Sequence, residues 1–261
     1  MTQPASTSAG VLLIGHGTRD AVGTEQFFEL ERRLAQRLGS TPVAAALLEF
    51  QRPSIPEGWN SLLSEGVQHV HVAPLLLFAA GHAKQDIPEV IRACVTATPS
   101  ITHDQSRPVS RHPSIVELVV QRISNALGQI SVAPERTSVV MVGRGSHDPC
   151  AQADMRVLTE VVKQRLPVAT VETAFYAMAE PKLPAVLNAV ASSGRYDAVV
   201  VYPHLLFEGR LNQAIIRQTE EASALFPALT WRTAEYLGPN EQVADAIATR
   251  IEQAAARPLH R

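Results

Sequence analysis

Short apolar runs and longer amphipathic stretches alternate along this chain. Residues 11–14 form an apolar run closed by Gly15, which is typical of a buried strand. Residues 24–38 instead place Phe27, Leu30 and Leu34 at helical spacing. The same patterns predict further strands over 43–50, 69–77 and, more weakly, 101–105, and further helices over 54–65, 83–97 and 113–127. The first half therefore reads as strand, helix, strand, helix throughout.

The pattern of the first half returns in the second. Residues 11–20, VLLIGHGTRD, reappear as residues 139–148, VVMVGRGSHD, so the offset is 139 − 11 = 128. The same offset relates Pro53 to Pro181 and Arg122 to Arg250. Strands are accordingly expected near 138–143, 169–176, 197–203 and 229–235. We expect two duplicated lobes, residues 1–130 and 131–261, joined near 128–136.

Alternating strands and helices indicate a fold class. Such chains form α/β proteins with parallel sheets covered by helices on both faces. We expect two tandem flavodoxin-like or Rossmann-like lobes related by a pseudo-twofold axis. Ligands of open parallel sheets bind at the carboxyl ends of the strands. Residues directly after the strands are therefore the candidates for function.

Composition narrows the class of protein. The formal net charge of −2 lacks the basic excess of a generic nucleic-acid or membrane-surface binder. Residues 1–10 do not resemble a signal peptide, and no apolar run reaches the roughly 18 residues that cross a bilayer. Cys94 and Cys150 are far apart and suit a reducing compartment. We expect a cytoplasmic protein that binds neither nucleic acid nor membranes.

Three strand ends of the first half carry reactive side chains. His16 follows the first strand between two glycines, Glu49 lies at the end of the second, and His82 follows the third. Parallel strands bring these ends to one edge of the sheet. Two neutral imidazoles and a carboxylate suit a borderline divalent metal. We therefore predict that His16 and His82 form a metal-binding pair.

Structural roles compete with this interpretation. A lone histidine after a strand is usually solvated or structural, and Glu49 could instead cap a helix or pair with Arg52. His69 and His71 lie early in the third strand, so we expect them at the opposite edge with a structural role. His147 and His204 of the second half could line a cleft or serve packing.

The second half lacks the metal-binding groups. The offset of 128 replaces His16 by Arg144, Glu49 by Ala177 and His82 by Arg210. Arginine remains protonated and cannot serve as a base or a metal ligand. Arg144 and Arg210 could bind the carboxylates of an anionic ligand, or they could be ordinary surface residues.

Several motifs, in order, resemble those of one enzyme family. LIGHGTRD, LLEFQRPSIPEG and VAPLLLFAAGHAKQDIPE in the first half, with VGRGSHDPCAQAD and YPHLLFEGRL in the second, are similar to the class II chelatases of tetrapyrrole biosynthesis. The resemblance covers nearly the whole chain and is to the long, two-lobed sirohydrochlorin cobaltochelatases and ferrochelatases. It implies insertion of a divalent metal into sirohydrochlorin, for cobalamin or sirohaem biosynthesis.

The resemblance also implies roles for particular residues. His16 and His82 match the metal-binding histidines, with His16 also expected to accept a proton and Glu49 to act as a supporting acid or base. The expected substrate-binding residues are Arg52, Leu77, Phe78, Ala79, Ala80, Gly81, Arg144 and Arg210, and Arg19 and Lys84 are further candidate partners of substrate carboxylates. No permanent cofactor is expected, because the metal (Co²⁺, Fe²⁺ or Ni²⁺) is itself a substrate. We expect a monomer whose two lobes form a pseudo-dimer.

Two alternatives share this fold class. The first is a tetrapyrrole or metal carrier without catalytic activity, which has less need of a base beside the metal. The second is a dehydrogenase-like or phosphate-binding enzyme, which fold class alone suggests. The glycine order of a dinucleotide fingerprint is missing from GHGTRDAVG, which counts against that second alternative.

Overall fold

The computed structural model describes residues 8–78 and 85–256. The chain forms two compact units. Unit 1 contains the chain up to residue 110 together with the segment from residue 239 onward, and unit 2 contains residues 111–238. Each unit is a parallel α/β layer structure, which confirms the predicted fold class.

The sheet of unit 1 has four parallel strands. They are β1 (Ala9–Gly15), β2 (Val43–Leu47), β3 (His69–Pro74) and β4 (Thr102–Gln105), in the spatial order β2-β1-β3-β4. This is the order of a flavodoxin-like sheet, which decides between the two topologies expected from the sequence. The chain reverses its direction of winding at β1, so the ends of β1 and β3 flank the place where such sheets bind ligands.

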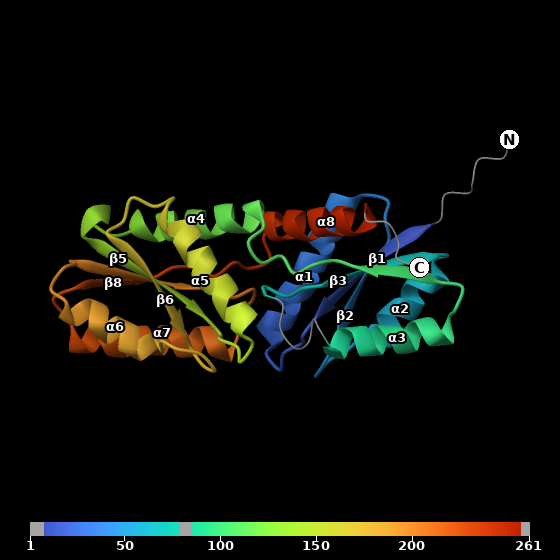
Figure 1. Cartoon of the computed structure of the whole chain (residues 1–261), viewed down its shortest axis with the longest axis horizontal. Coiled ribbons are helices and arrows are strands. Elements are labelled where there is room, and N and C mark those ends of the chain that lie inside the picture. The colour runs from blue at the N-terminus through green and yellow to red at the C-terminus, as the bar shows by residue number, and fades with distance from the viewer. Residues whose placement is uncertain (1–7, 79–84, 257–261) are drawn as a thin grey trace. The chain divides into compact units, whose positions relative to one another are not determined.

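Helices cover both faces of this sheet. On one face, α2 (Ile55–Ser64) and α3 (Ile87–Ala97) bury Trp59 and Ile91 against Leu12, Ile14 and neighbouring strand residues. The other face carries α1 (Ala21–Leu38) and α8 (Glu241–Ala255) (Figure 1). Helix α1 begins after a residue whose side chain caps it. The Asp20 carboxylate accepts a hydrogen bond from the Gly23 N–H at 3.0 Å.

Unit 2 repeats the architecture. Its strands are β5 (Thr137–Gly143), β6 (Thr170–Phe175), β7 (Ala198–Pro203) and β8 (Thr230–Thr233), in the order β6-β5-β7-β8. Helices α6 (Leu183–Ser192) and α7 (Arg210–Leu225) cover one face, and α4 (Pro113–Leu127) and α5 (Pro149–Lys163) cover the other. The central strands β5 and β7 are fully buried, as expected for a sheet covered on both faces.

The last helix of each repeat belongs to the unit built by the other repeat. Helix α4 follows β4 in sequence but packs against β7 and α5, whereas α8 follows β8 but packs against α1, β3 and β4. The compact units therefore differ from the expected lobes 1–130 and 131–261. Because the two repeats share one pattern of buried positions, either repeat can supply the helix that closes a sheet.

The offset between the repeats is also not constant. β1 and β5 correspond in sequence with an offset of 128, but Ile14 pairs with Pro74 whereas Val142 pairs with Pro203, so β3 and β7 are offset by 203 − 74 = 129. The second repeat has one more residue before β7 and one fewer between Phe207 and Gly209 than between Phe78 and Gly81. The offset returns to 128 in β4 and β8.

Two predicted strands are shorter than expected. β2 ends at Leu47 because the chain turns back there, and the Leu47 N–H donates to the Pro53 carbonyl at 2.8 Å. β3 ends at Pro74, although the apolar run continues beyond it.

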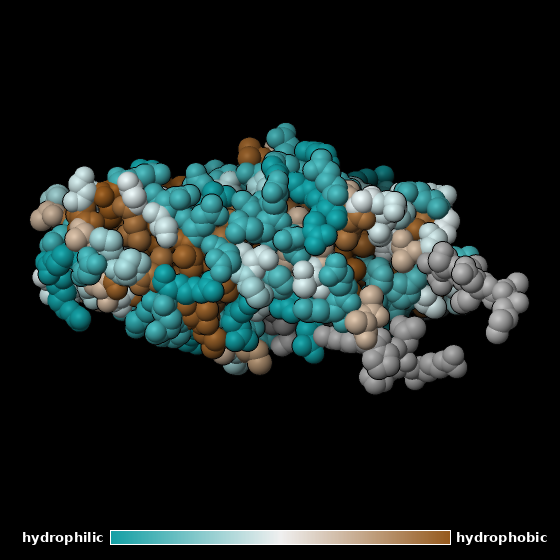
Figure 2. All heavy atoms as spheres, turned by 90° about the horizontal axis from the view of Figure 1, so that it is seen from above, coloured by the Kyte–Doolittle hydropathy of each residue, from teal (hydrophilic) through white to brown (hydrophobic). Residues whose placement is uncertain are grey.

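Hydrophilic residues predominate on the face drawn in Figure 2. In the described residues, no helix is both long and apolar enough to span a membrane.

Candidate functional site

His16 stands directly after the central strand β1, between two glycines that the packing requires. A Cβ atom at Gly15 would lie 2.7 Å from the Phe27 ring. Gly17 has a φ of +90°, and a Cβ atom there would lie 2.1 Å from the Glu49 carbonyl oxygen. The glycines therefore let the loop after β1 lie against the loop after β2.

Backbone hydrogen bonds hold these two loops together. The Leu48 N–H donates to the Gly15 carbonyl at 2.9 Å, and the Glu49 N–H donates to the His16 carbonyl at 3.0 Å. The Gln51 side-chain amide adds a bond to the Thr18 carbonyl at 3.0 Å. The structure thus brings His16 and Glu49 side by side, as the sequence predicted for neighbouring strand ends.

An exposed aromatic residue lies beside His16. Phe50 has a φ of +69° and is 53% exposed. Its ring meets the His16 ring edge-on, with 6.3 Å between centroids, and the Arg19 guanidinium lies 5.0 Å from its centroid. An apolar surface and a cation therefore adjoin the candidate base, an arrangement that suits a flat anionic ligand.

Arg52 lies at the other end of the same loop. Its side chain is 86% exposed, and its guanidinium lies 3.3 Å from a carboxylate oxygen of Glu57. Glu57 also caps α2 by accepting bonds from the Ser54 N–H and hydroxyl, which lower the pKa of Glu57. Among the described residues, the ion pair of Arg52 is with Glu57, so pairing with Arg52 does not account for Glu49.

The third strand end is described only in part. The Leu75 N–H donates to the Ile14 carbonyl at 2.8 Å, which carries the chain to the same edge of the sheet as His16. Leu77 and Phe78 follow and are half-buried. Other predicted site residues lie outside the described residues; these are Ala79, Ala80, Gly81, His82 and Lys84. The predicted pairing of His16 with His82 therefore stays a prediction.

Unit 2 reproduces the loops with different side chains. The Ala177 N–H donates to the Arg144 carbonyl at 2.9 Å, as Glu49 does to His16. Gly145 has a φ of +89° and would clash with the Ala177 carbonyl if it carried a Cβ atom. Arg144 is exposed after β5, and Arg210 is exposed at the start of α7.

His204 follows β7 in unit 2 and is buried, with 1% of its surface exposed. Its Nδ1 lies 3.4 Å from the Tyr202 hydroxyl. Burial lowers the pKa of His204 to about 3, so the imidazole is neutral at ordinary pH. Of the two roles considered for this residue, the burial supports packing.

A cluster at the opposite end of β3 was assigned only a structural role from the sequence. Asp104 of β4 lies 2.9 Å from His71 Nδ1 and 3.2 Å from His69 Nε2. Burial raises the pKa of Asp104, but hydrogen bonds and charge interactions with His71 and His69 outweigh that effect and lower it. Sequence spacing could have paired the two histidines on one strand face, but the carboxylate comes from another strand.

Comparison with known proteins identifies the family. The model of the CbiX family matches the chain twice, over residues 10–126 and 138–254. These matches confirm the duplication, since both ends differ by 128. Sirohydrochlorin ferrochelatase of Bacillus subtilis is 28% identical over 94% of this chain and 92% of the relative. Sirohydrochlorin cobaltochelatase of Priestia megaterium is 27% identical over 93% of this chain and 79% of the relative.

A solved structure supports the same assignment. "SirB from Bacillus subtilis with Fe3+" has a TM-score of 0.83 and 29% sequence identity, and the match covers 95% of this chain and 96% of that one. Both repeats, both sheets and nearly the full length are thus accounted for by one family. This chain belongs to the CbiX family.

Proposed function

We propose that this protein is a sirohydrochlorin chelatase, an enzyme that inserts a divalent metal into sirohydrochlorin. The observation that carries the proposal is the loop after β1, which places His16 beside Glu49 at the ligand-binding edge of a flavodoxin-like sheet. The relatives that share this architecture carry the same activity in their names. The product would serve sirohaem or cobalamin biosynthesis.

The reaction requires a proton acceptor and groups that bind the metal. Two pyrrole N–H groups lose their protons as the dication enters the macrocycle, so the products are the metallated ring and two protons. His16 in its neutral form can accept a proton and can also hold the metal. We assign His82 as the second metal ligand. Glu49 is exposed to solvent and can pass protons onward as a supporting acid or base.

The substrate carries several carboxylates around a flat ring. Phe50, Leu77 and Phe78 offer apolar surface at the candidate edge of unit 1. Arg19 and Arg52 provide exposed cations there, and we assign Arg144 and Arg210 of unit 2 to the same task of binding carboxylates. We also propose a monomeric, cytoplasmic enzyme whose metal is a substrate and not a resident cofactor.

The direct test is metallation of purified sirohydrochlorin under anaerobic conditions. Co²⁺, Fe²⁺ and Ni²⁺ are compared with and without protein, and the change in the absorption spectrum is followed. The proposal predicts acceleration over the uncatalysed rate with Co²⁺ or Fe²⁺. A carrier would bind sirohydrochlorin and shift its spectrum without accelerating metallation by any of the three ions, and that result would overturn the proposal. The rank order of rates identifies the preferred metal, because intrinsic affinity order does not.

A further inference from the structure

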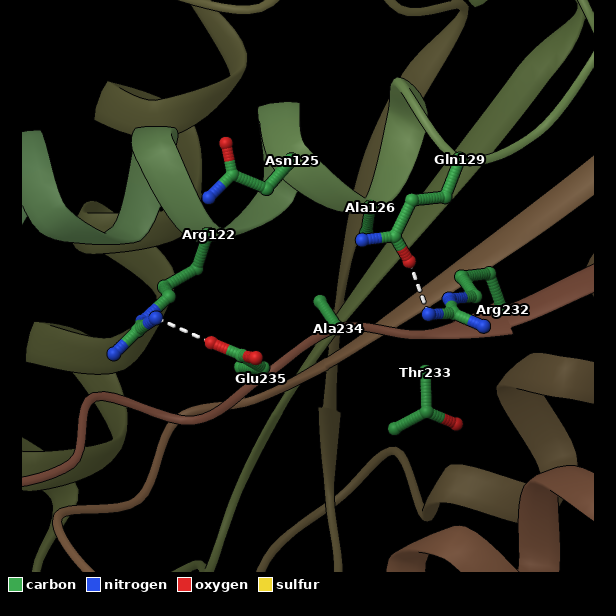
Figure 3. Close-up of a pocket in the computed structure, with 8 residues that line it drawn as sticks. All are labelled: Arg122, Asn125, Ala126, Gln129, Arg232, Thr233, Ala234 and Glu235. Atoms are coloured by element: carbon green, nitrogen blue, oxygen red, sulfur yellow. Dashed lines mark hydrogen bonds and ion pairs between the residues drawn. The ribbon is translucent and has the colours of Figure 1, made fainter.

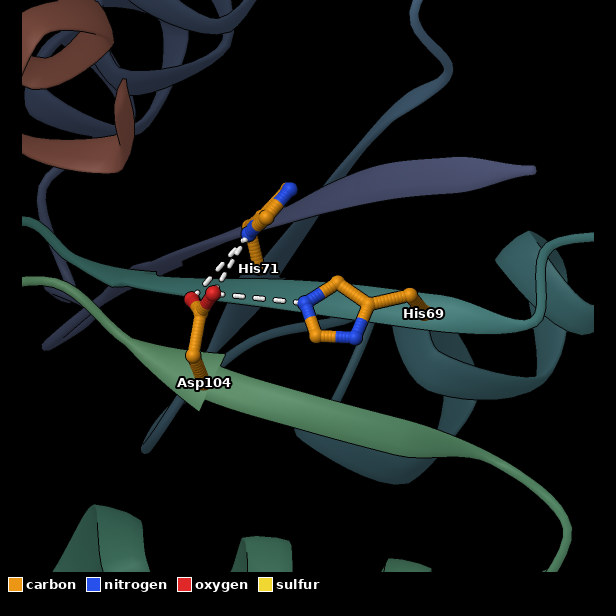
Figure 4. A group of neighbouring side chains, drawn as sticks. All are labelled: His69, His71 and Asp104. Carbon is orange, nitrogen blue, oxygen red and sulfur yellow. Dashed lines mark hydrogen bonds and ion pairs between the residues drawn. The ribbon is translucent and has the colours of Figure 1, made fainter. Parts of the chain in front are cut away.

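We propose that His69, His71 and Asp104 form a second binding site for a divalent transition metal, separate from the candidate catalytic edge. Figure 4 shows the three side chains converging from two adjacent strands. His69 and His71 are two residues apart, so they project from the same face of β3. Asp104 is the register partner of His71 on β4, which places its carboxylate between the two rings.

The distances fit a shared ion. Neighbouring ligand atoms around a metal held at about 2.0–2.1 Å are separated by roughly 2.9–3.4 Å. Asp104 Oδ2 lies 2.9 Å from His71 Nδ1 and 3.2 Å from His69 Nε2. One donor atom from each residue can be chosen so that all three lie within 4.8 Å of one another. Small side-chain rotations therefore suffice to enclose an ion.

A hydrogen bond orients one of the ligands. His69 Nδ1 lies 2.7 Å from the Thr102 hydroxyl oxygen, and that hydroxyl donates onward to the Gln68 carbonyl at 3.4 Å. This contact fixes the orientation of the His69 ring, so that Nε2 faces Asp104. A divalent ion bound by both atoms would take the place of the proton that joins Nε2 to the Asp104 carboxylate at 3.2 Å.

The cluster is accessible and its donor set is selective. The side chains of His69, His71 and Asp104 are 16%, 13% and 15% exposed, so an ion can enter and keep water in its remaining positions. Two imidazoles with one carboxylate suit Zn²⁺, Co²⁺, Ni²⁺ or Fe²⁺ and not Ca²⁺ or Mg²⁺, which prefer oxygen ligands.

Unit 2 shows that the fold does not require these residues. The register of β7 and β8 places Ala198, Val200 and Arg232 where unit 1 has His69, His71 and Asp104. Arg232 there donates to Gln129, and Arg122 pairs with Glu235 beside it, around a small pocket (Figure 3). A sheet of the same topology therefore forms with a cation at the position of Asp104. Folding of the sheet does not require the His–His–Asp set, which leaves binding of a ligand as its proposed role.

The site lies far from the candidate catalytic edge. His69 pairs with Ala9 at the start of β1, and His16 is 16 − 9 = 7 residues further along. At about 3.3 Å per residue, the two places are separated by roughly 23 Å along the strand direction. One ion cannot contact both, so the second site would hold an ion of its own.

The test is binding of Zn²⁺ alone to full-length protein without a polyhistidine tag. His16→Ala/His82→Ala removes the histidines of the candidate catalytic edge and serves as the background. Calorimetric titration of this background is expected to show one equivalent of Zn²⁺. Adding Asp104→Asn or His71→Gln should weaken binding by more than about 100-fold, because even losing an outer partner of a ligand costs about 10- to 100-fold. Thr102→Val should weaken Zn²⁺ binding less, by about 10- to 100-fold, because Thr102 contacts a ligand and not the ion.

The matched control is His103→Gln in the same background. His103 is adjacent to Asp104 on β4 but packs against Trp59 on the other face of the sheet, so its loss should leave Zn²⁺ affinity unchanged. Circular dichroism shows which variants are folded, and Zn²⁺ should raise Tm only in those that keep the site. Absence of Zn²⁺ binding in the background, or unchanged affinity after both Asp104→Asn and His71→Gln, would overturn the proposal. None of these readouts depends on metallation activity.

Discussion

The loops after β1 and after β5 share a backbone and differ in their chemistry. Both contain a glycine near φ +90° that is pressed against a carbonyl of the neighbouring loop, and both make the same inter-loop hydrogen bond. In unit 1 this backbone carries His16 and Glu49, whereas in unit 2 it carries Arg144 and Ala177. The backbone is therefore a requirement of the fold, and the side chains on it are free to differ in function.

The opposite ends of the two sheets differ in the same way. Unit 1 has two histidines and an aspartate there, and unit 2 has an alanine, a valine and an arginine with its own hydrogen-bond partner. Duplication thus lets one copy act as an internal control for the other. A residue that is present in one unit and replaced in the other, on an unchanged backbone, is a better functional candidate than a residue present in both.

The largest expected effect is on turnover, from His16→Ala compared with Arg144→Ala. Removing the proton acceptor and metal ligand should lower kcat for metallation by about 10²- to 10⁴-fold. Arg144→Ala should mainly raise KM for sirohydrochlorin, because it removes a charge that binds substrate. Steady-state metallation kinetics measure both. Equal loss of kcat at saturating substrate in the two variants would contradict the division between the units.

The next effect distinguishes the structural role of the two loop backbones from the catalytic role of the side chains on the loop of unit 1. Gly17→Ala and Gly145→Ala place a Cβ atom against the Glu49 and Ala177 carbonyls at a positive φ, so each should lower the free energy of unfolding by about 1–3 kcal/mol. Urea unfolding measures this loss. Only Gly17→Ala should also impair kcat, since it displaces the loop that carries Glu49.

Gly39→Ala is the control for these two variants. Gly39 also has a positive φ, of +64°, but nothing lies within 4 Å of the Cβ position, so it reports backbone strain without the clash. If Gly145→Ala impaired turnover at saturating substrate as much as Gly17→Ala, the two loops would not differ in function as proposed.

The last effect concerns acid stability and involves His204 of unit 2. Below about pH 6.5 the unfolded chain protonates this histidine, whereas burial keeps it neutral in the folded chain down to about pH 3. The unfolded chain thus binds more protons in this range, and acidification lowers the free energy of unfolding. His204→Gln should remove up to about 1.4 kcal/mol per pH unit from that dependence.

Urea unfolding between pH 4 and 7 measures this slope. The exposed His147 of the same unit supplies the control, since His147→Gln should leave the slope close to that of the unchanged protein. An unchanged slope in His204→Gln would mean that His204 takes up its proton in the folded chain as readily as in the unfolded one.

Local patterns in the sequence determined the elements, the duplication and the strand-end residues. Apolar runs closed by glycine predicted β1 and β5, and helical spacing predicted α1, because burial imposes a period on the residues of each element. The neighbourhood of His16 and Glu49 could also be predicted, since parallel strands end at one edge of their sheet. These properties depend on residues close together in the chain or on topology alone.

Only the tertiary structure decided which segments from distant parts of the chain come together. No local pattern shows that α8 closes the sheet of unit 1 or that α4 closes that of unit 2, because both helices present the same kind of apolar face. Only the tertiary structure places Asp104 beside His69 and His71. Register between strands brings together residues that are more than thirty positions apart, and the sequence does not encode that register locally.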